Sequence, residues 1–397
     1  MRLIWTNFGK NENFPNNSGS KKVRDNMSKK FISFVDEGLL KMTYTSRLQS
    51  YLEGNVVDVN PFDLFDVETP LAINSGYSKT DILNDFGLYT DMVHLKKSLY
   101  GIDYMYIGMD QKGIGSILGS ETKMTEKGDS LTSVYALDDY KDFSKMENID
   151  IKSSETVVNF IEKAKKTKEA MRGITIFGAV TGPLTTASGV RPVEKLLRDT
   201  RKNKEEIKRL LEMCTDYTIE FVKIFTEEVG GCFFKIADPV SSLNVISKKQ
   251  YDEFTQPYME KLSDSVYEIT GIKPMVHICG KTDKVWDNFR DSSFSRFSVD
   301  NIEDIEQLKN SLGDNMIIEG NIAPMDILLN TDPETVRNEV KTLLQKASDS
   351  PKGYILNAGC TVCDNTPIEN IESYIRAVCE FGKDASIGNL PKGLTNI

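Results

Sequence analysis

Hydrophobic and polar residues alternate in blocks along most of this chain. Short runs rich in apolar and β-branched residues are followed by longer stretches with apolar positions at helical spacing, which predicts strands alternating with helices. The predicted strands are 61–67, 104–110, 174–180, 232–238, 273–279, 296–300, 316–321 and 354–360. Helical patterns cover 193–228, 248–270, 303–312, 333–347 and 367–381. Eight such steps predict a parallel sheet closed into a single α/β domain, a (β/α)8 or TIM barrel.

Two segments depart from this alternation. The polar residues between 10 and 30 predict a loosely packed N-terminal arm, bounded at 1–40, before a helix over 43–55 and a barrel over 41–385. Residues 112–137, rich in Gly, Ser and Thr, predict a β-hairpin inserted between barrel elements. Gly113 and Gly115 lie there, but the further glycine and the helix start that a phosphate-binding loop needs are not expected.

Charge and composition narrow the function classes. The 397 residues carry a net charge of -10, which disfavours nucleic acid as a partner because phosphate backbones repel an acidic protein. No apolar run is long enough to predict a transmembrane helix, and the first residues do not resemble a secretory signal, so a cytoplasmic location is expected. In that compartment the six cysteines are expected to be reduced and available as metal ligands.

Reactive side chains gather at the predicted strand ends. In a parallel barrel the C-terminal ends of the strands form the active-site face. The residues that fall there are Asp238, His277, Cys279, Asp300, Glu319 and Cys360.

His277 and Cys279 are two positions apart on one strand, so their side chains share a face and can address one metal ion. Cys360 follows 81 residues later, a gap that holds three strand–helix steps and returns the chain to the same rim. Two thiolates, one imidazole and an exchangeable fourth position are typical of a catalytic zinc site. The alternative is a buried cysteine and a hydrogen-bonded histidine without metal, because His-x-Cys alone is a weak signal.

The remaining candidates have plainer interpretations. Cys363 forms a Cys-x-x-Cys motif with Cys360 but lies beyond the strand end, which favours an incidental thiol over a redox pair. His94 lies in a helical pattern and is interpreted as structural or surface. Asp238 precedes Pro239 and either caps the following loop or faces the pocket, where it would position substrate or a zinc ligand.

The chain resembles the uroporphyrinogen decarboxylase superfamily, and within it the cobalamin-dependent methyltransferases. The segments that carry the resemblance are residues 182–188 (GPLTTAS), 236–242 (IADPVSS), 276–280 (VHICG), 319–322 (EGNI), 358–360 (AGC) and 366–371 (TPIENI). The resemblance implies a barrel in which His277, Cys279 and Cys360 bind zinc. It also implies a carboxylate near Asp300 as a candidate fourth ligand, with Glu319 as the alternative. Asp238 and Glu319 are the implied catalytic residues.

The function implied by this resemblance is methyl transfer between a corrinoid and a zinc-activated thiol or related small acceptor. Methylcobalamin or a corrinoid-binding protein would be the partner, and transfer in either direction is open. The decarboxylase branch is the first alternative, but its N-terminal arginine-rich loop is not found before residue 60. A barrel that binds corrinoid or metal without catalysis is the second.

Overall fold

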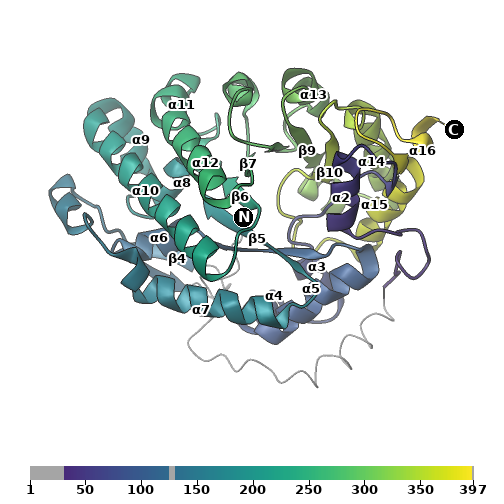
Figure 1. Ribbon diagram of the computed structural model, residues 1–397, viewed down its shortest axis with the longest axis horizontal. Coiled ribbons are helices and arrows are strands. Elements are labelled where there is room, and N and C mark those ends of the chain that lie inside the picture. The colour runs from purple at the N-terminus through teal and green to yellow at the C-terminus, as the bar shows by residue number, and fades with distance from the viewer. Residues whose placement is uncertain (1–30, 125–129, 396–397) are drawn as a thin grey trace.

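The computed structural model describes residues 31–124 and 130–395. Within this part of the chain seven parallel strands form one curled sheet in the order β10-β9-β8-β7-β6-β5-β2, with helices around its outside (Figure 1). The strands are β2 (Tyr104–Met109), β5 (Thr175–Thr181), β6 (Phe234–Ala237), β7 (Met275–Ile278), β8 (Arg296–Val299), β9 (Ile317–Ile322) and β10 (Tyr354–Ala358). These strands coincide with seven of the eight predicted ones, and the predicted barrel-type α/β fold is confirmed.

The first predicted strand, 61–67, is wrong as an extended element. Only Phe62 pairs with β10, through a parallel bridge to Leu356. The Leu356 amide donates to the Pro61 carbonyl, and the Asp63 amide donates to the Leu356 carbonyl, each at 2.9 Å. Proline has no amide hydrogen, and Asp66 adopts a left-handed φ of 61°, so the chain turns away after this short contact. The eighth position of the barrel is therefore occupied by two or three residues rather than by a strand.

The predicted helices are confirmed, with breaks inside the two longest patterns. The 193–228 pattern divides at Asn203, and 248–270 divides at Thr255. The helices outside the sheet are α2 (Tyr44–Leu52), α3 (Glu68–Asn74), α4 (Lys79–Asn84), α5 (Phe86–Tyr100), α7 (Glu155–Ala170), α8 (Pro183–Ser188), α9 (Val193–Lys202), α10 (Lys204–Glu228), α11 (Lys248–Phe254), α12 (Gln256–Thr270), α13 (Ile305–Leu312), α14 (Pro333–Ala347), α15 (Ile368–Phe381) and α16 (Lys392–Thr395). None of the helices within the described ranges has the length and apolar character needed to cross a membrane.

The insertion after β2 is only partly a hairpin. Strands β3 (Glu121–Met124) and β4 (Ser130–Val134) pair antiparallel, as predicted. The preceding residues instead form α6 (Gln111–Ile117), because the Asp110 side chain accepts hydrogen bonds from the amides of Lys112 and Gly113 and so caps a helix. The expectation that no helix starts here is wrong, and capping is the reason.

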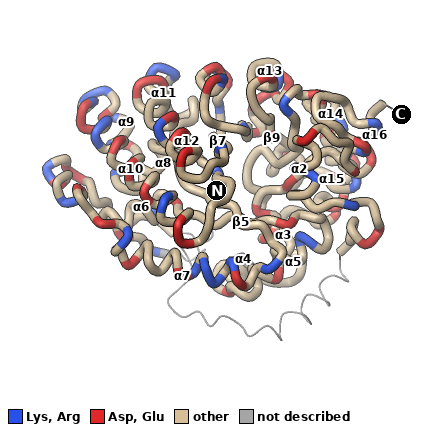
Figure 2. The backbone as a smooth tube through the Cα atoms, in the orientation of Figure 1, with Lys and Arg blue, Asp and Glu red and all other residues tan. Residues whose placement is uncertain are grey.

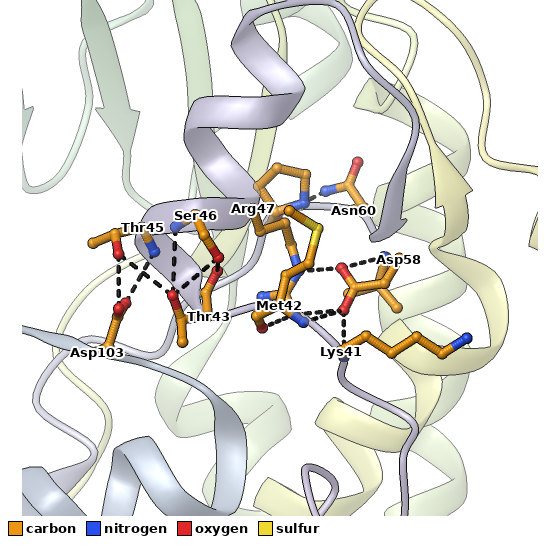
Figure 3. Close-up of polar contacts among 11 residues, drawn as sticks. Lys41, Met42, Thr43, Thr45, Ser46, Arg47, Asp58, Asn60 and Asp103 are labelled. Atoms are coloured by element: carbon orange, nitrogen blue, oxygen red, sulfur yellow. Dashed lines mark hydrogen bonds and ion pairs between the residues drawn. The ribbon is translucent and has the colours of Figure 1, made fainter.

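The segment before the barrel is anchored by a buried ion pair. The Arg47 guanidinium on α2 donates to Asp58 at 2.7 Å and to the Met42 carbonyl at 2.7 Å, and Arg47 is fully buried (Figure 3). Asp58 lies on β1 (Val57–Val59), which pairs with β11 (Lys383–Ala385). Of the predicted arm, residues 1–30 lie outside the described part, while Phe34 in the remainder is fully buried.

Candidate metal centre

Strand alternation brings two of the predicted ligands into the barrel. On β7 the outward residues Val276 and Ile278 pack in the core, so His277 faces inward and Cys279, just past the strand end, follows on the same side. Cys360 comes two residues after the end of β10. Gly359 allows this approach: a Cβ there would lie 2.4 Å from the Asn301 amide nitrogen.

The three side chains converge on one point. The candidate ligand atoms of His277, Cys279 and Cys360 all lie within 4.8 Å of one another. The His277 Nε2 is 3.1 Å from the Cys279 Sγ, and the two sulfur atoms are 3.6 Å apart. His277 is buried and both cysteines are partly buried. Two thiols and one imidazole at these separations have the chemistry and the spacing of a three-residue zinc site.

The two thiols differ in acidity. The hydrogen bond between them lowers the pKa of Cys360 and raises the pKa of Cys279. His277 lowers the pKa of Cys360 further by a hydrogen bond and by its charge. Cys360 is therefore the first of the pair to ionise, and the thiolate is the form that binds metal or attacks an electrophile.

Ser298 orients the imidazole, and sequence reasoning missed it. It lies on β8 opposite His277 in the parallel ladder, and its Oγ is 3.0 Å from the His277 Nδ1. A hydrogen bond from Nδ1–H to this oxygen leaves Nε2, the nitrogen beside the thiols, free to bind a metal. The signal available in the sequence was an inward-facing polar position on the neighbouring strand, two residues before Asp300.

The turn after Cys279 is held by Asp300, the expected fourth ligand. Its Oδ2 accepts from the Gly280 amide at 2.8 Å, and its Oδ1 accepts from the Ile302 amide at 3.1 Å. Gly280 has a φ of 84°, and a Cβ there would come within 2.4 Å of the Ser242 Oγ, so a larger residue does not fit. Asp300 is absent from the group of clustered metal-binding side chains found among the described residues.

Asp238 directly follows β6, and its carboxylate is directed at α8. It is fully buried and accepts hydrogen bonds from the Thr185 amide at 2.8 Å and the Thr185 hydroxyl at 2.5 Å. Burial raises its pKa to about 6, against the opposing effect of these hydrogen bonds. Its amide donates to the His277 carbonyl at 3.0 Å. Asp238 therefore links α8 to the strand that carries His277.

Glu319 lies on β9 opposite Ser298 in the parallel ladder. Its Oε2 is 2.9 Å from the Arg296 Nη1, and its Oε1 accepts from the Asn357 amide group at 2.7 Å. The same Arg296 nitrogen donates to the Tyr44 hydroxyl at 3.1 Å. Glu319 is buried, and these contacts account for both of its oxygens.

Cys363, Cys214 and His94 do not belong to the cluster of His277, Cys279 and Cys360. Burial raises the pKa of the Cys363 thiol, and this residue is outside the metal-binding group found in the described ranges. Cys214 is completely buried on α10, where burial likewise raises its thiol pKa. His94 lies on α5 and is not among the clustered metal-binding side chains found in the described residues.

The sequence of this chain matches the model of a known protein family. The family model described as uroporphyrinogen decarboxylase (URO-D) matches residues 43–381. A methylated-thiol–coenzyme M methyltransferase from Methanosarcina mazei is 27% identical over 224 residues, covering 56% of this chain and 58% of the relative. The methylcobamide:CoM methyltransferase MtaA from Methanosarcina barkeri is 29% identical over 209 residues, covering 52% and 59%.

These matches span less than two thirds of the two methyltransferases. A uroporphyrinogen decarboxylase from Francisella philomiragia is 22% identical over 289 residues, covering 71% of this chain and 81% of the relative. Among solved structures, a methyltransferase from Methanosarcina mazei superposes with a TM-score of 0.68 at 21% identity, covering 86% of this chain and 99% of that chain. This structural likeness supports the fold.

Proposed function

The chain belongs to the uroporphyrinogen decarboxylase family, and from that premise we propose that it is a zinc-dependent methyltransferase. It moves a methyl group between a corrinoid, free or protein-bound, and a small thiol. In the thiol-methylating direction the thiol loses its proton and its sulfur forms the new bond to carbon. The cobalt–carbon bond breaks with its electron pair left on cobalt, so the products are a thioether and Co(I).

The observation that carries this proposal is the convergence of His277, Cys279 and Cys360 within 4.8 Å. The donor set fits zinc, because borderline-soft Zn²⁺ accepts thiolate and imidazole ligands together. Zinc bound there would hold the substrate sulfur as its thiolate, the nucleophilic form. The names of the two Methanosarcina relatives describe methyltransferases acting on CoM, one of them with a methylcobamide, and these names point to the same reaction class.

The surrounding residues support the three ligands. Ser298 fixes the ring of His277, and Asp300 holds the turn that follows Cys279. Because both Asp300 oxygens already accept backbone hydrogen bonds, we assign it a positioning role and leave the fourth position to the substrate. Asp238 and Glu319, the expected catalytic carboxylates, are likewise assigned to positioning: Asp238 through its hydrogen bonds to α8, and Glu319 through its ion pair with Arg296.

The decarboxylase alternative is weaker on the residues described. A carboxylated tetrapyrrole needs exposed cations near the barrel mouth, as does any polyanionic substrate. Arg47 is the arginine that precedes residue 60 in the described part of the chain, and it is fully buried against Asp58 (Figure 3). On the outer helices Lys and Arg are interspersed with Asp and Glu (Figure 2).

Metal analysis of purified protein tests the proposal. We expect about one zinc per chain in the wild type, and loss of that zinc in Cys279→Ala and in Cys360→Ala. Cys363→Ala is the matched control, because it removes a thiol three residues from Cys360 that lies outside the cluster, and it should retain zinc. The second step is an assay of methylcobalamin with a thiol, followed by the absorbance of the cobalt product. Zinc-free reduced protein that takes up none on addition would refute the proposal, and so would zinc-loaded protein without turnover.

A further inference from the structure

A turn at Phe65 and Asp66 follows the short contact that replaces the first barrel strand. The chain leaves β10 after Phe62, and Asp66 then adopts a φ of 61°, in the left-handed region. Few residues other than glycine occupy this region, and a backbone held there is strained. Such conformations persist where surrounding contacts fix them, and they gather at functional sites. The contacts of this turn therefore indicate what it does.

The turn binds the two residues that directly follow Cys360. The Phe65 carbonyl accepts a hydrogen bond from the Val362 amide at 2.9 Å. The Asp66 Oδ2 accepts from the Thr361 hydroxyl at 3.0 Å. Cys360 lies two residues past the end of β10, so its position depends on contacts of this kind rather than on the hydrogen bonds of the sheet.

The chain before Cys360 is fixed from the other side. The Gly359 amide donates to the carbonyl of Ile322, the last residue of β9, at 2.9 Å. A Cβ at Gly359 would lie 2.4 Å from the Asn301 amide nitrogen, so the backbone packs closely against the segment after β8. Cys360 is therefore held between the ends of β8 and β9 on one side and the Phe65–Asp66 turn on the other. Loss of either support would let its sulfur move relative to Cys279.

The same turn contacts the histidine of the candidate metal centre. The Phe65 ring lies edge-on to the His277 imidazole, with ring centres 6.0 Å apart and planes inclined by 74°. An edge-to-face contact of this kind favours one relative orientation of two rings. The turn therefore touches one candidate ligand directly and holds the chain next to a second.

The Asp66 carboxylate is kept here against an energetic penalty. Burial, and then the charge of Glu68, raise the pKa of this carboxyl, and the hydrogen bond from Thr361 is among the contacts that oppose the shift. The backbone bond between Val362 and Phe65 would join the two segments without any carboxylate. What the carboxylate adds is the bond to the Thr361 side chain.

We propose that Asp66 is a positioning residue for the metal centre, acting through the Thr361 hydroxyl to fix the Cys360 sulfur beside Cys279 and His277. The inference rests on the proposed function, because it concerns zinc binding by those three side chains. It also gives the interrupted first strand a role, since the left-handed turn at Asp66 brings the carboxylate to Thr361.

Two variants of Asp66 separate the side chain from the turn. Asp66→Gly adopts a positive φ readily but has no carboxylate, whereas Asp66→Asn keeps the shape, the tolerance of this φ and an accepting oxygen. Zinc affinity is measured by competition with a chromogenic chelator, without turnover. We expect Asp66→Gly to bind zinc about tenfold to a hundredfold more weakly than the wild type, the usual effect of losing a contact that supports a ligand. Asp66→Asn should bind zinc nearly as tightly as the wild type.

The other member of the hydrogen bond gives an independent test. Thr361→Val removes the hydroxyl at nearly constant shape and should weaken zinc binding as Asp66→Gly does, while Thr361→Ser should retain it. The double variant Asp66→Gly/Thr361→Val should bind zinc no more weakly than either single variant, because each removes the same interaction. Thr361→Val leaves the backbone at Asp66 untouched, so it tests the inference even if the Asp66 variants fail to fold.

Thr45→Val is the matched control. The Thr45 hydroxyl donates to the Asp103 Oδ2 at 2.7 Å, which is the same pair of groups (Figure 3). Asp103 directly precedes β2, so this bond lies at the opposite ends of the strands from the candidate metal centre. Zinc affinity should be unchanged in Thr45→Val.

Cobalt(II) bound in place of zinc gives a second readout. Its absorbance reports the thiolate ligands, so the thiolate-to-cobalt band should weaken in Asp66→Gly and Thr361→Val but not in Thr45→Val. Unchanged zinc affinity and an unchanged cobalt spectrum in Asp66→Gly and Thr361→Val, with or without a loss of thermal stability, overturn the inference and leave the proposed function standing. Wild-type protein that binds no zinc overturns both. Weakened zinc binding in these variants of a protein without methyl transfer supports the inference and overturns the proposed function alone.

Discussion

Replacing Arg296 with methionine should destabilise the barrel far more than an arginine substitution at the surface. The Arg296 Nη1 lies 2.9 Å from the Glu319 Oε2, and the two side chains are only 6% and 2% exposed. Removing one member of such a buried pair leaves the other charge uncompensated in a medium of low polarity, at a cost of about 3–5 kcal/mol. The carboxylate of Glu319 would retain the hydrogen bond from Asn357 alone.

The double variant Arg296→Met/Glu319→Gln isolates the electrostatic part of this cost. Glutamine keeps the shape of Glu319 and an oxygen for Asn357 but has no charge, so most of the lost stability should return. Arg290→Met is the matched surface control: Arg290 lies 2.8 Å from Asp287, but the two side chains are 49% and 77% exposed. That substitution should cost about 0–1 kcal/mol.

Urea unfolding, followed by circular dichroism at equal zinc content, measures these differences. The midpoint and the slope are compared together, because a changed slope would indicate a changed denatured state or a loss of two-state behaviour. A loss below about 1 kcal/mol in Arg296→Met would refute the reasoning, since it would match the surface control. A double variant no more stable than the single one would also refute it.

Two further predictions concern the site and the interior carboxylates. Ser298→Ala should weaken zinc binding by about 10–100-fold without unfolding the protein, because the His277 ring loses the contact at Nδ1. Competition with a chelator measures the zinc affinity, and an unchanged affinity would contradict this prediction. Burial raises the pKa of Asp63 from 3.8 to about 6, so the folded state binds this proton more tightly than the unfolded state. The resulting stability is present below the unfolded pKa and is lost as pH rises through about 6. The difference between wild-type and Asp63→Asn stability, measured in urea from pH 4 to 7, should therefore fall with pH, and a flat difference would contradict the assignment.

The convergence of the three candidate ligands was predictable because it depends on two simple periodicities in the sequence. Alternation along a strand places His277 and Cys279 on one face, and the strand–helix repeat returns Cys360 to the same rim. The structure brings the three within 4.8 Å, as this reasoning requires. Seven strand positions were predictable for the same reason, since their apolar runs are bounded by helical patterns.

The first strand was not predictable from its apolar residues. Residues 61–67 have the composition of a strand, but the backbone leaves the sheet after Phe62 because Asp66 turns it in a left-handed conformation. The helix at 111–117 was not predicted because its local composition favours a different structure. Its glycines suggest a loop, and the capping carboxylate of Asp110 outweighs that local preference.

By itself the sequence determined seven of the strand positions, the inward face of β7 and the convergence of one histidine and two cysteines at the rim, because each depends on spacing along the chain. Only the tertiary structure decided the partners of those residues. Ser298 meets His277 through strand register, and Asp300 reaches the Gly280 amide across two strand ends. Whether an interior cation meets a carboxylate, as Arg296 meets Glu319, depends on distances across the barrel between residues far apart in the chain. Local sequence preferences do not specify those distances.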